Sequence, residues 1–390
     1  MTLPRSLLVL SGILAFASFA QPHHEYVLTL EDPKEHFLKV TLTVSSSAKA
    51  AFVDFGLPAW APGAYQIANY AKFVQEFSAC SESGEPLAFQ KIDKQTWRVF
   101  SRAGMKEIRI SYRIFANILS DVESEFNEEH AQVFGPQVFM YVMHQKKIPA
   151  RLRVEGLRGW RIATSLEAQN DSTFFAPNYD ELIDAPLEIG NFSETRFEAE
   201  GAAFRLAVHG EEKSERVGEF AQKLKKIVTE QSRMLGSMPS RQYVFIWHID
   251  PRAEYYGLEH FNSTSIGMPH GLGDHSSVEG WDLYAGLANQ DIDLEYAAHE
   301  FFHLWNVKRI RPFELGPFDY SREVYTTGLW IAEGVTDYYG YLTLVRCGLW
   351  SPTKWLRLYA NIIGNYRRAS GWKFRGPSAN SFDVWLWNYG

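Results

Sequence analysis

Apolar and polar residues alternate along much of the first half of the chain, a period of two that is typical of half-buried β-strands. The alternating runs cover residues 26–30, 38–44, 97–99 and 108–114. Turn-forming residues separate them, for example at Asp32-Pro33. The pattern predicts an antiparallel β-sandwich-like N-terminal domain over residues 21–195, with one sheet face exposed to solvent.

Helical spacing of apolar residues becomes prominent further along the chain. It predicts helices over about residues 214–235, from Asp291 to about Val307, and around 329–339, with a strand over 243–247. Gly190-Asn191 leads into a polar stretch, which marks a domain boundary near residues 190–202. The chain is therefore predicted to be α+β, with a second, mainly α-helical domain over residues 196–390.

The helix predicted to begin at Asp291 carries the sequence His299-Glu300-Phe301-Phe302-His303. Residues four apart share one helical face, so both imidazoles can reach a single zinc ion at about 2.0–2.1 Å. Glu300 lies one step around the helix, where it can take a proton from zinc-bound water. We predict that His299 and His303 are metal ligands and that Glu300 is the catalytic base. The alternative is a core helix whose histidines only satisfy neighbouring carbonyl groups.

A third protein ligand is needed if a fourth position is to remain for water. Residues 304–309 contain no Gly or His at the spacing of the extended three-histidine motif, so that class is excluded. Glu314 and Glu323 lie in polar loops, whereas Glu333 lies in an apolar helix. A carboxylate in such a helix costs several kcal/mol to bury unless it is paired or binds a metal. The sequence therefore predicts Glu333 as the third ligand of one zinc ion.

Asp337 follows Glu333 by four residues and so shares its helical face. It could accept the free N–H of a ligand histidine, as metal-bound histidines usually require. The alternative is a solvated helix residue.

Residues 299–312, the Trp-x-x-Glu-Gly segment of residues 330–334, and residues 256–263 together resemble metallopeptidase family sixty-one, the glycyl aminopeptidases. The resemblance covers about residues 240–345. It implies a thermolysin-like catalytic domain of the gluzincin type, preceded by a β-rich domain and followed by a PDZ domain. It also implies removal of small N-terminal residues such as glycine and alanine.

By this resemblance, residues 256–259 form a strand edge that lies along the substrate. Gly257 and Glu259 are then substrate-binding, with Glu259 holding the free amine of the peptide through a charge-assisted hydrogen bond. Tyr256 stands where a second glycine is usual, and its bulk is expected to narrow or reshape the pocket. The alternative for Glu259 is a strand residue that faces solvent.

The family places a Tyr-x-Lys-Gly element towards its C-terminus, where the tyrosine is expected to stabilise the oxyanion. This chain contains no such element, and Tyr389 is the nearest candidate. The catalytic domain is therefore expected to be incomplete at its C-terminus, without the PDZ domain.

Composition narrows the function classes and the location. The net charge of −7 and the absence of a basic run argue against a nucleic-acid partner. Arg5, a short apolar run and small residues at positions 18 and 20 predict a signal peptide over residues 1–20 and export to the periplasm or outside the cell. A membrane anchor is the alternative for this segment, and no other stretch is long and apolar enough to cross a bilayer.

The cysteines, the other histidines and two loops are not predicted to bind the catalytic metal. Cys80 and Cys347 belong to no Cys-x-x-Cys motif, so zinc must be bound without thiolates. They are expected to be isolated buried thiols, with a disulfide between them as the alternative in an exported protein. Residues 267–275, rich in glycine and histidine, are predicted to form a loop near the cleft, with a second metal site as the less favoured alternative.

Four further histidines have no ligand-like spacing and are predicted to be surface or core residues: His23, His24, His130 and His144. Residues 57–65 form an aromatic loop that is predicted to pack against neighbouring segments, with contact to substrate or to the catalytic domain as the alternative.

Taken together, these residues predict a zinc-dependent aminopeptidase that acts on peptides with a free N-terminus. One alternative is a zinc endopeptidase, in which Glu259 does not bind an amine. The other is a catalytically impaired, exported peptide-binding protein that lacks the oxyanion-stabilising tyrosine.

Overall fold

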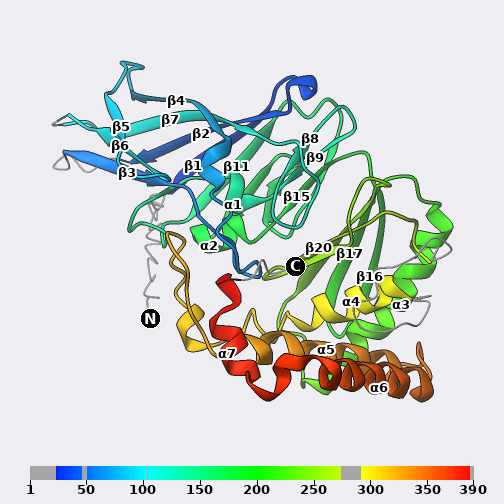
Figure 1. The fold of residues 1–390 in the computed structure, drawn as a ribbon. Helices are drawn as coiled ribbons and strands as arrows, with labels where there is room; N and C mark the ends of the chain where they lie inside the picture. The colour runs from blue at the N-terminus through cyan, green and yellow to red at the C-terminus, as the bar shows by residue number, and fades with distance from the viewer. Residues whose placement is uncertain (1–22, 46–50, 103, 274–290, 387–390) are drawn as a thin grey trace, which may run out of the picture.

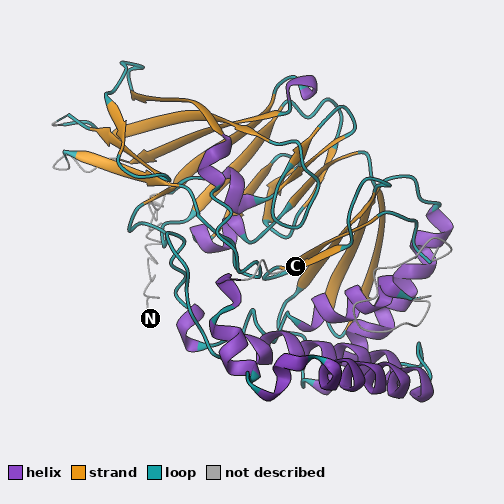
Figure 2. Ribbon diagram, viewed as in Figure 1, coloured by secondary structure: helices purple, strands orange, loops and turns teal. Residues whose placement is uncertain are grey.

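The computed structural model describes residues 23–45, 51–102, 104–273 and 291–386. A sheet-rich N-terminal region precedes a helical C-terminal part (Figure 1), and colouring by secondary structure separates the two clearly (Figure 2). The predicted α+β class is confirmed at this level. The predicted signal peptide and Tyr389 lie outside the described residues.

The largest sheet has seven strands in the order β13-β14-β11-β1-β2-β7-β4. Their bounds are β1 His24–Leu30, β2 Phe37–Ser45, β4 Val74–Ser81, β7 Glu107–Phe115, β11 Ala150–Glu155, β13 Glu167–Asn170 and β14 Thr173–Ala176. Every second residue of β1 and β2 is buried, as the alternation predicts. The expectation of a purely antiparallel arrangement is wrong for one pair, because β1 and β11 run parallel. Parallel neighbours need a long connection, and the strands between β1 and β11 in the chain supply it.

Two four-stranded sheets, β10-β3-β6-β5 and β12-β15-β9-β8, complete the N-terminal region. Their bounds are β3 Phe52–Gly56, β5 Phe89–Lys91, β6 Thr96–Phe100, β8 Glu125–Phe126, β9 His130–Val133, β10 Tyr141–Val142, β12 Arg161–Ala163 and β15 Leu187–Gly190. Short helices connect the strands: η1 Pro33–Glu35, η2 Tyr70–Phe73, α1 Gly135–Val138 and α2 Tyr179–Ile183. One hydrophobic core joins all three sheets, with Leu42, Phe55 and Ile189 as fully buried members.

A further sheet follows, with five strands in the order β16-β17-β18-β20-β19. Their bounds are β16 Ser193–Ala199, β17 Ala202–His209, β18 Gln242–Ile249, β19 Tyr256–Glu259 and β20 Ser263–Met268. Strands β17, β18 and β20 are parallel, and helix α3 (Ser214–Met234) provides the crossover from β17 to β18. The antiparallel strand β19 lies at the edge of this sheet. The region predicted to be a mainly α-helical second domain therefore begins with a five-stranded sheet, and its helices other than α3 follow that sheet.

From residue 292 onward the described chain forms helices joined by turns and loops. Their bounds are α4 Ile292–Phe302, η3 Phe313–Leu315, α5 Leu329–Arg346, α6 Pro352–Arg368, η4 Ser370–Lys373, α7 Pro377–Phe382 and η5 Val384–Leu386. Helix α4 contacts β19 and β20 on one side and α5 on the other. It ends earlier than predicted, because tight turns begin at His303, whose carbonyl accepts from both Val307 and Lys308. None of the described helices is long and apolar enough to span a bilayer.

The two cysteines are free, and both are half-buried rather than fully enclosed. Cys80 lies in β4, and Cys347 follows the last residue of α5. Since the two residues belong to different halves of the molecule, their separation agrees with the prediction of isolated thiols.

The aromatic loop, residues 57–65, connects the two halves. Trp60 is fully buried, and its indole N–H donates to the carbonyl of Asp319 at 2.8 Å. Its ring packs edge-on against Trp385, with 5.3 Å between centroids, and also contacts Tyr65 and Phe318. The predicted packing role is confirmed, and the loop also contacts the second half of the chain.

Replacing Trp60 with alanine is expected to destabilise the protein by about 3–5 kcal/mol, the usual cost of truncating a buried aromatic residue. The change leaves a cavity between the two halves and removes the partner of the Asp319 carbonyl. Urea unfolding followed by tryptophan fluorescence and circular dichroism measures the effect. Phe313→Ala is the matched control, since Phe313 is 91% exposed and should shift stability by no more than about 0.5 kcal/mol.

Candidate active site

Helices α4 and α5 bring three potential metal ligands together. The Nε2 atoms of His299 and His303 are 2.9 Å apart. The Oε2 atom of Glu333 lies 3.6 Å from Nε2 of His299 and 3.5 Å from Nε2 of His303. Four-residue spacing on α4 aligns the two imidazoles, and the packing of α5 on α4 places the carboxylate opposite them.

The other nitrogen of each histidine also has a partner. Nδ1 of His299 lies 2.8 Å from Oδ1 of Asp337, and Nδ1 of His303 lies 2.7 Å from the carbonyl of Asn306. Acceptors at Nδ1 leave Nε2 of both rings with a free lone pair, the tautomer that a metal ion requires. The side chain of Asn306 donates to the carbonyls of Ile331 and Ala332 and so ties the end of α4 to α5. Sequence reasoning did not single out Asn306 for this role.

The three side chains fit a divalent metal ion. Two imidazole nitrogens and one carboxylate suit zinc, and donor atoms about 3.3 Å apart correspond to metal–ligand distances of about 2.0 Å in a tetrahedral site. The observed separations fall on both sides of that value. The pKa of Glu333 lies well below its usual range, because the two histidines outweigh the opposing effect of burial.

Glu300 lies beside this group and is buried, with its Oε2 atom making no hydrogen bond to any described residue. Burial raises its pKa to about 7, and the nearby carboxylates of Glu259 and Glu333 add to the rise against the opposing effect of the histidines. A base with a pKa near 7 can both accept and return a proton at neutral pH.

Strand β19 runs alongside Glu300. A Cβ atom on Gly257 would overlap both the carboxylate of Glu300 and the ring of Tyr296. Glycine is therefore required at this position so that the strand can approach helix α4. The β19 edge away from β20 has no partner strand among the described residues, so its main chain can pair with an extended peptide.

Glu259 is 5% exposed and lies within 4.8 Å of donor atoms of Glu300 and His303. The alternative of a solvent-facing strand residue is therefore wrong. Its Oε1 atom makes no hydrogen bond to a described residue, and its nearest cation is Nζ of Lys308 at 3.9 Å. Lys308 is held more closely by Asp184, at 3.2 Å, which also contacts Nδ1 of His260 at 2.9 Å.

Tyr256 does not narrow the pocket beside Glu259. Successive side chains of a strand point to opposite faces, so Tyr256 and Gly257 lie on different sides of β19. The ring of Tyr256 is buried over Gly267, and its hydroxyl lies 2.8 Å from Nδ1 of His248. The expectation that the bulk of Tyr256 would reshape the pocket is therefore wrong.

The aromatic loop closes the site from the N-terminal half. Gly63 has a positive φ of 99°, and a Cβ there would lie 2.9 Å from Oε2 of Glu259. Trp60, Gly63, Tyr65 and Lys308 help to line a cavity of about 10 Å³ at Glu259. Burial raises the pKa of Tyr65 well above its usual value, and Glu333 and Glu259 add to this effect because they lie close to it.

Sequence reasoning considered contact between this loop and the catalytic half only as an alternative, and it missed Lys308 and Asp184. The carboxyl-rich crevice between the halves depends on residues far apart in the chain. The string from Trp305 to Pro312 was the only local signal that pointed to Lys308.

The glycine- and histidine-rich segment, residues 267–275, lies partly in β20 and partly beyond the described residues. Nε2 of His270 lies 2.5 Å from the hydroxyl of Tyr255. Among the described residues, no metal-binding group of three side chains includes His270. The alternative of a second metal site in this loop gains no support from the described part.

Two family models match this chain, one over the sheet-rich N-terminal region and one over the helical C-terminal part. Residues 25–191 match the family model of the peptidase M61 N-terminal domain, and residues 293–390 match that of the M61 glycyl aminopeptidase. Together these two segments cover most of the chain, which therefore belongs to the M61 peptidase family. The predicted family is confirmed. A search among curated proteins found no match.

Two solved structures share the fold. An aminopeptidase N family protein from Idiomarina loihiensis superposes with a TM-score of 0.84 at 26% identity, over 94% of this chain and 62% of that one. The present chain thus spans less than two thirds of the length of that relative. Aminopeptidase A of Legionella pneumophila, solved with aspartic acid, has a TM-score of 0.50 at 12% identity, over 84% of this chain and 38% of its own. A mutant M1 zinc metallopeptidase from Deinococcus radiodurans, bound to a Tyr-Ser-Ala substrate, has a TM-score of 0.48 at 15% identity, over 88% and 74%.

Replacing Glu333 with glutamine is expected to remove most of the bound metal, because an amide is a far weaker ligand than a carboxylate at this position. Metal content after purification and dialysis, measured by mass spectrometry, tests this. Glu314→Gln and Glu323→Gln are matched controls from the loops before α5 and should keep the metal. Loss of metal in either control, with retention in Glu333→Gln, would contradict the ligand set.

Proposed function

We propose that the protein is a zinc-dependent aminopeptidase that removes small N-terminal residues from peptides. The observation that carries this proposal is the position of Glu259. Its carboxylate is buried, its Oε1 atom makes no hydrogen bond to a described residue, and it lies beside Glu300 and His303. A buried carboxylate oxygen without a hydrogen bond is costly, and the ammonium group of a peptide would supply that bond.

Charge balance supports the same assignment. Asp184, Glu259, Glu300 and Glu333 carry up to four negative charges in this crevice, and Lys308 supplies one positive charge among them. A divalent metal ion and one substrate ammonium group would add three positive charges to this crevice. A peptide with a blocked N-terminus would add one fewer.

The size of the cavity favours a small first residue. Its volume of about 10 Å³ corresponds to roughly one water molecule. The metal ligands do not line this cavity, so its size describes only the room beside the carboxylate of Glu259. On that basis we propose glycine or alanine as the first residue. This agrees with the preference that the family resemblance implies.

The residues divide the chemistry between them. The free edge of β19 aligns the peptide backbone, and Glu259 fixes the amine, so that the first peptide bond lies near Glu300. Zinc held by His299, His303 and Glu333 would polarise the scissile carbonyl and lower the pKa of the attacking water towards about 7. Glu300 accepts the proton of that water and then donates it to the departing amine. Asp337 keeps His299 in the tautomer with a free Nε2.

A second candidate is a zinc endopeptidase, favoured by one observation. Lys308 approaches Glu259 to 3.9 Å and could neutralise it without any substrate amine. Its closer contact with Asp184, at 3.2 Å, argues for the first candidate. The leader-like residues 1–20 support an exported protein in either case.

The variant Glu300→Gln is expected to keep its zinc and to lose about 10²–10⁴-fold in kcat, because the amide cannot accept the proton of water. Hydrolysis of glycyl and alanyl amides, together with metal content, measures both effects. Glu295→Gln on the same helix is the matched control and should retain activity. Full turnover by Glu300→Gln would exclude it as the base.

Free and N-acetylated forms of the same peptide separate the two candidates. An aminopeptidase cleaves only the free form, and Glu259→Gln should lower kcat/KM for it by about 10–100-fold, the loss of one charged hydrogen bond. Glu254→Gln, an exposed residue just before β19, is the control. Equal cleavage of both peptides, unaffected by Glu259→Gln, would favour the endopeptidase.

A further inference from the structure

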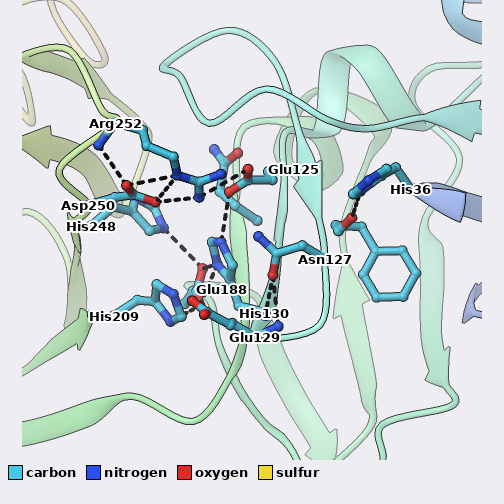
Figure 3. A network of polar contacts seen from close by, with 12 residues as sticks. His36, Glu125, Asn127, Glu129, His130, Glu188, His209, His248, Asp250 and Arg252 are labelled. Carbon is cyan, nitrogen blue, oxygen red and sulfur yellow. Dashed lines mark hydrogen bonds and ion pairs between the residues drawn. The ribbon is translucent and has the colours of Figure 1, made fainter. Parts of the chain in front are cut away.

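A second group of histidines and carboxylates lies away from the candidate active site. It lies where strands β9 and β15 of one sheet meet strands β17 and β18 of the five-stranded sheet. Figure 3 shows His130, His209 and His248 converging on Glu188. His130 and His248 are 1% and 0% exposed, and Glu188 is fully buried. His130 and Glu188 belong to the N-terminal region, whereas His209 and His248 belong to the five-stranded sheet.

The donor atoms have the spacing of a metal site. Nδ1 of His130 lies 3.1 Å and 3.2 Å from the two carboxylate oxygens of Glu188. Nε2 of His248 lies 3.0 Å from Oε2 of Glu188. These separations are within a few tenths of an ångström of the roughly 3.3 Å between ligands of tetrahedral zinc. They also fall within the range found for His299, His303 and Glu333.

The remaining nitrogen of each histidine is held as it is in a metal site. Nε2 of His130 lies 3.0 Å from Oε2 of Glu125, and Nδ1 of His248 lies 2.8 Å from the hydroxyl of Tyr256. Such partners fix the ring orientation and the tautomer of ligand histidines. They leave Nδ1 of His130 and Nε2 of His248 directed at Glu188.

His209 provides an independent observation. It is 8% exposed, and its Nδ1 atom makes no hydrogen bond within the described part of the chain, although it lies 3.3 Å from Oε1 of Glu188. Its ring stacks on His130 with 3.8 Å between centroids. A buried imidazole nitrogen directed at the same carboxylate, yet not bonded to it, is accounted for by a ligand between them.

The negative charge around Glu188 and the cavity beside it also favour a bound cation. Glu125, Glu188 and Asp250 carry three negative charges, and Arg252 is the one guanidinium or ammonium group that contacts them among the described residues, at 3.5 Å from Glu125 and 2.5 Å from Asp250. A divalent cation would add two positive charges to this group. His209, Asp250 and Arg252 line a cavity of about 1020 Å³, which gives an ion a route to the group.

We propose that His130, Glu188 and His248 bind a second zinc ion, with His209 beside its fourth position, and that this ion fastens the N-terminal region to the five-stranded sheet. Two imidazole nitrogens and a carboxylate suit zinc rather than calcium or magnesium, which prefer oxygen ligands. The three ligands are buried and come from both parts of the molecule, so the ion is assigned a structural role. Because Tyr256 contacts His248, the ion also supports the far face of strand β19.

The experiment counts zinc in a chain that cannot use the first group of ligands. The double variant His299→Ala/His303→Ala is stripped with chelator, incubated with zinc chloride and desalted. We expect one zinc per chain in this variant and two in the unaltered protein. Adding His248→Ala or Glu188→Gln should reduce the count of the double variant to near zero. His144→Asn, a change of an exposed histidine, is the matched control and should leave one.

Two further measurements keep the result decisive if the added variants fold poorly. Cobalt(II) bound to the double variant should show the visible absorption of tetrahedral coordination, and zinc should raise its melting temperature. A single zinc in the unaltered protein, together with no zinc and no thermal shift in the double variant, would overturn the proposal. Retention of zinc by the double variant after His248→Ala would place the ion elsewhere and would also overturn it.

Discussion

Burial of acidic side chains where the β-rich region meets the helices is the constraint on which the rest of the structure depends. An isolated carboxylate in such a place costs several kcal/mol, so each one needs a partner. Asp184 has Lys308 and His260, and Glu333 has the two histidines of α4. Glu259 and Glu300 each keep an oxygen that makes no hydrogen bond to a described residue. The unsatisfied groups lie together, and they are the groups that a metal ion, water and an amine would satisfy.

Two glycines let the main chain pass close to the buried carboxylates, which makes this concentration of charge possible. Gly257 lets β19 pass next to Glu300, and Gly63 lets the aromatic loop pass next to Glu259. Trp60 then secures the loop through its buried ring and its bond to Asp319. The site is therefore built from both halves of the chain. Its small cavity follows from these contacts rather than from the metal-binding helices alone.

The parts that could be predicted from the sequence are those encoded within one element. The spacing of His299 and His303 on a helix, and the placing of Glu333 in an apolar helix, required only the geometry of a helix and the cost of burying charge. Glu259 was identified through family resemblance, because nothing in a four-residue strand indicates which face is buried. Alternation predicted β1 and β2 but not the parallel pairing of β1 with β11, which joins segments far apart in the chain.

His130 also shows that a sequence pattern does not reveal contacts between distant strands. As a lone histidine without ligand-like spacing it was predicted to be a surface or core residue, and it is indeed buried. Its neighbours, however, are Glu188, His209 and His248, which come from three other strands. Periodicity along the chain carries no information about which strands will meet. Only the register of the two sheets places these side chains around one point.

Tyr256 links the two groups of charged residues through a single strand. It replaces a glycine that is usual in the resembling segment, and its ring lies over Gly267, its cross-strand neighbour in β20. An aromatic side chain that covers a glycine restores packing that the glycine alone would lack. One face of β19 therefore carries Gly257 and Glu259 towards helix α4, while the other carries Tyr256 towards His248. Since a strand cannot shift on one face alone, whatever holds His248 in place also sets the position of the edge along which a peptide would bind.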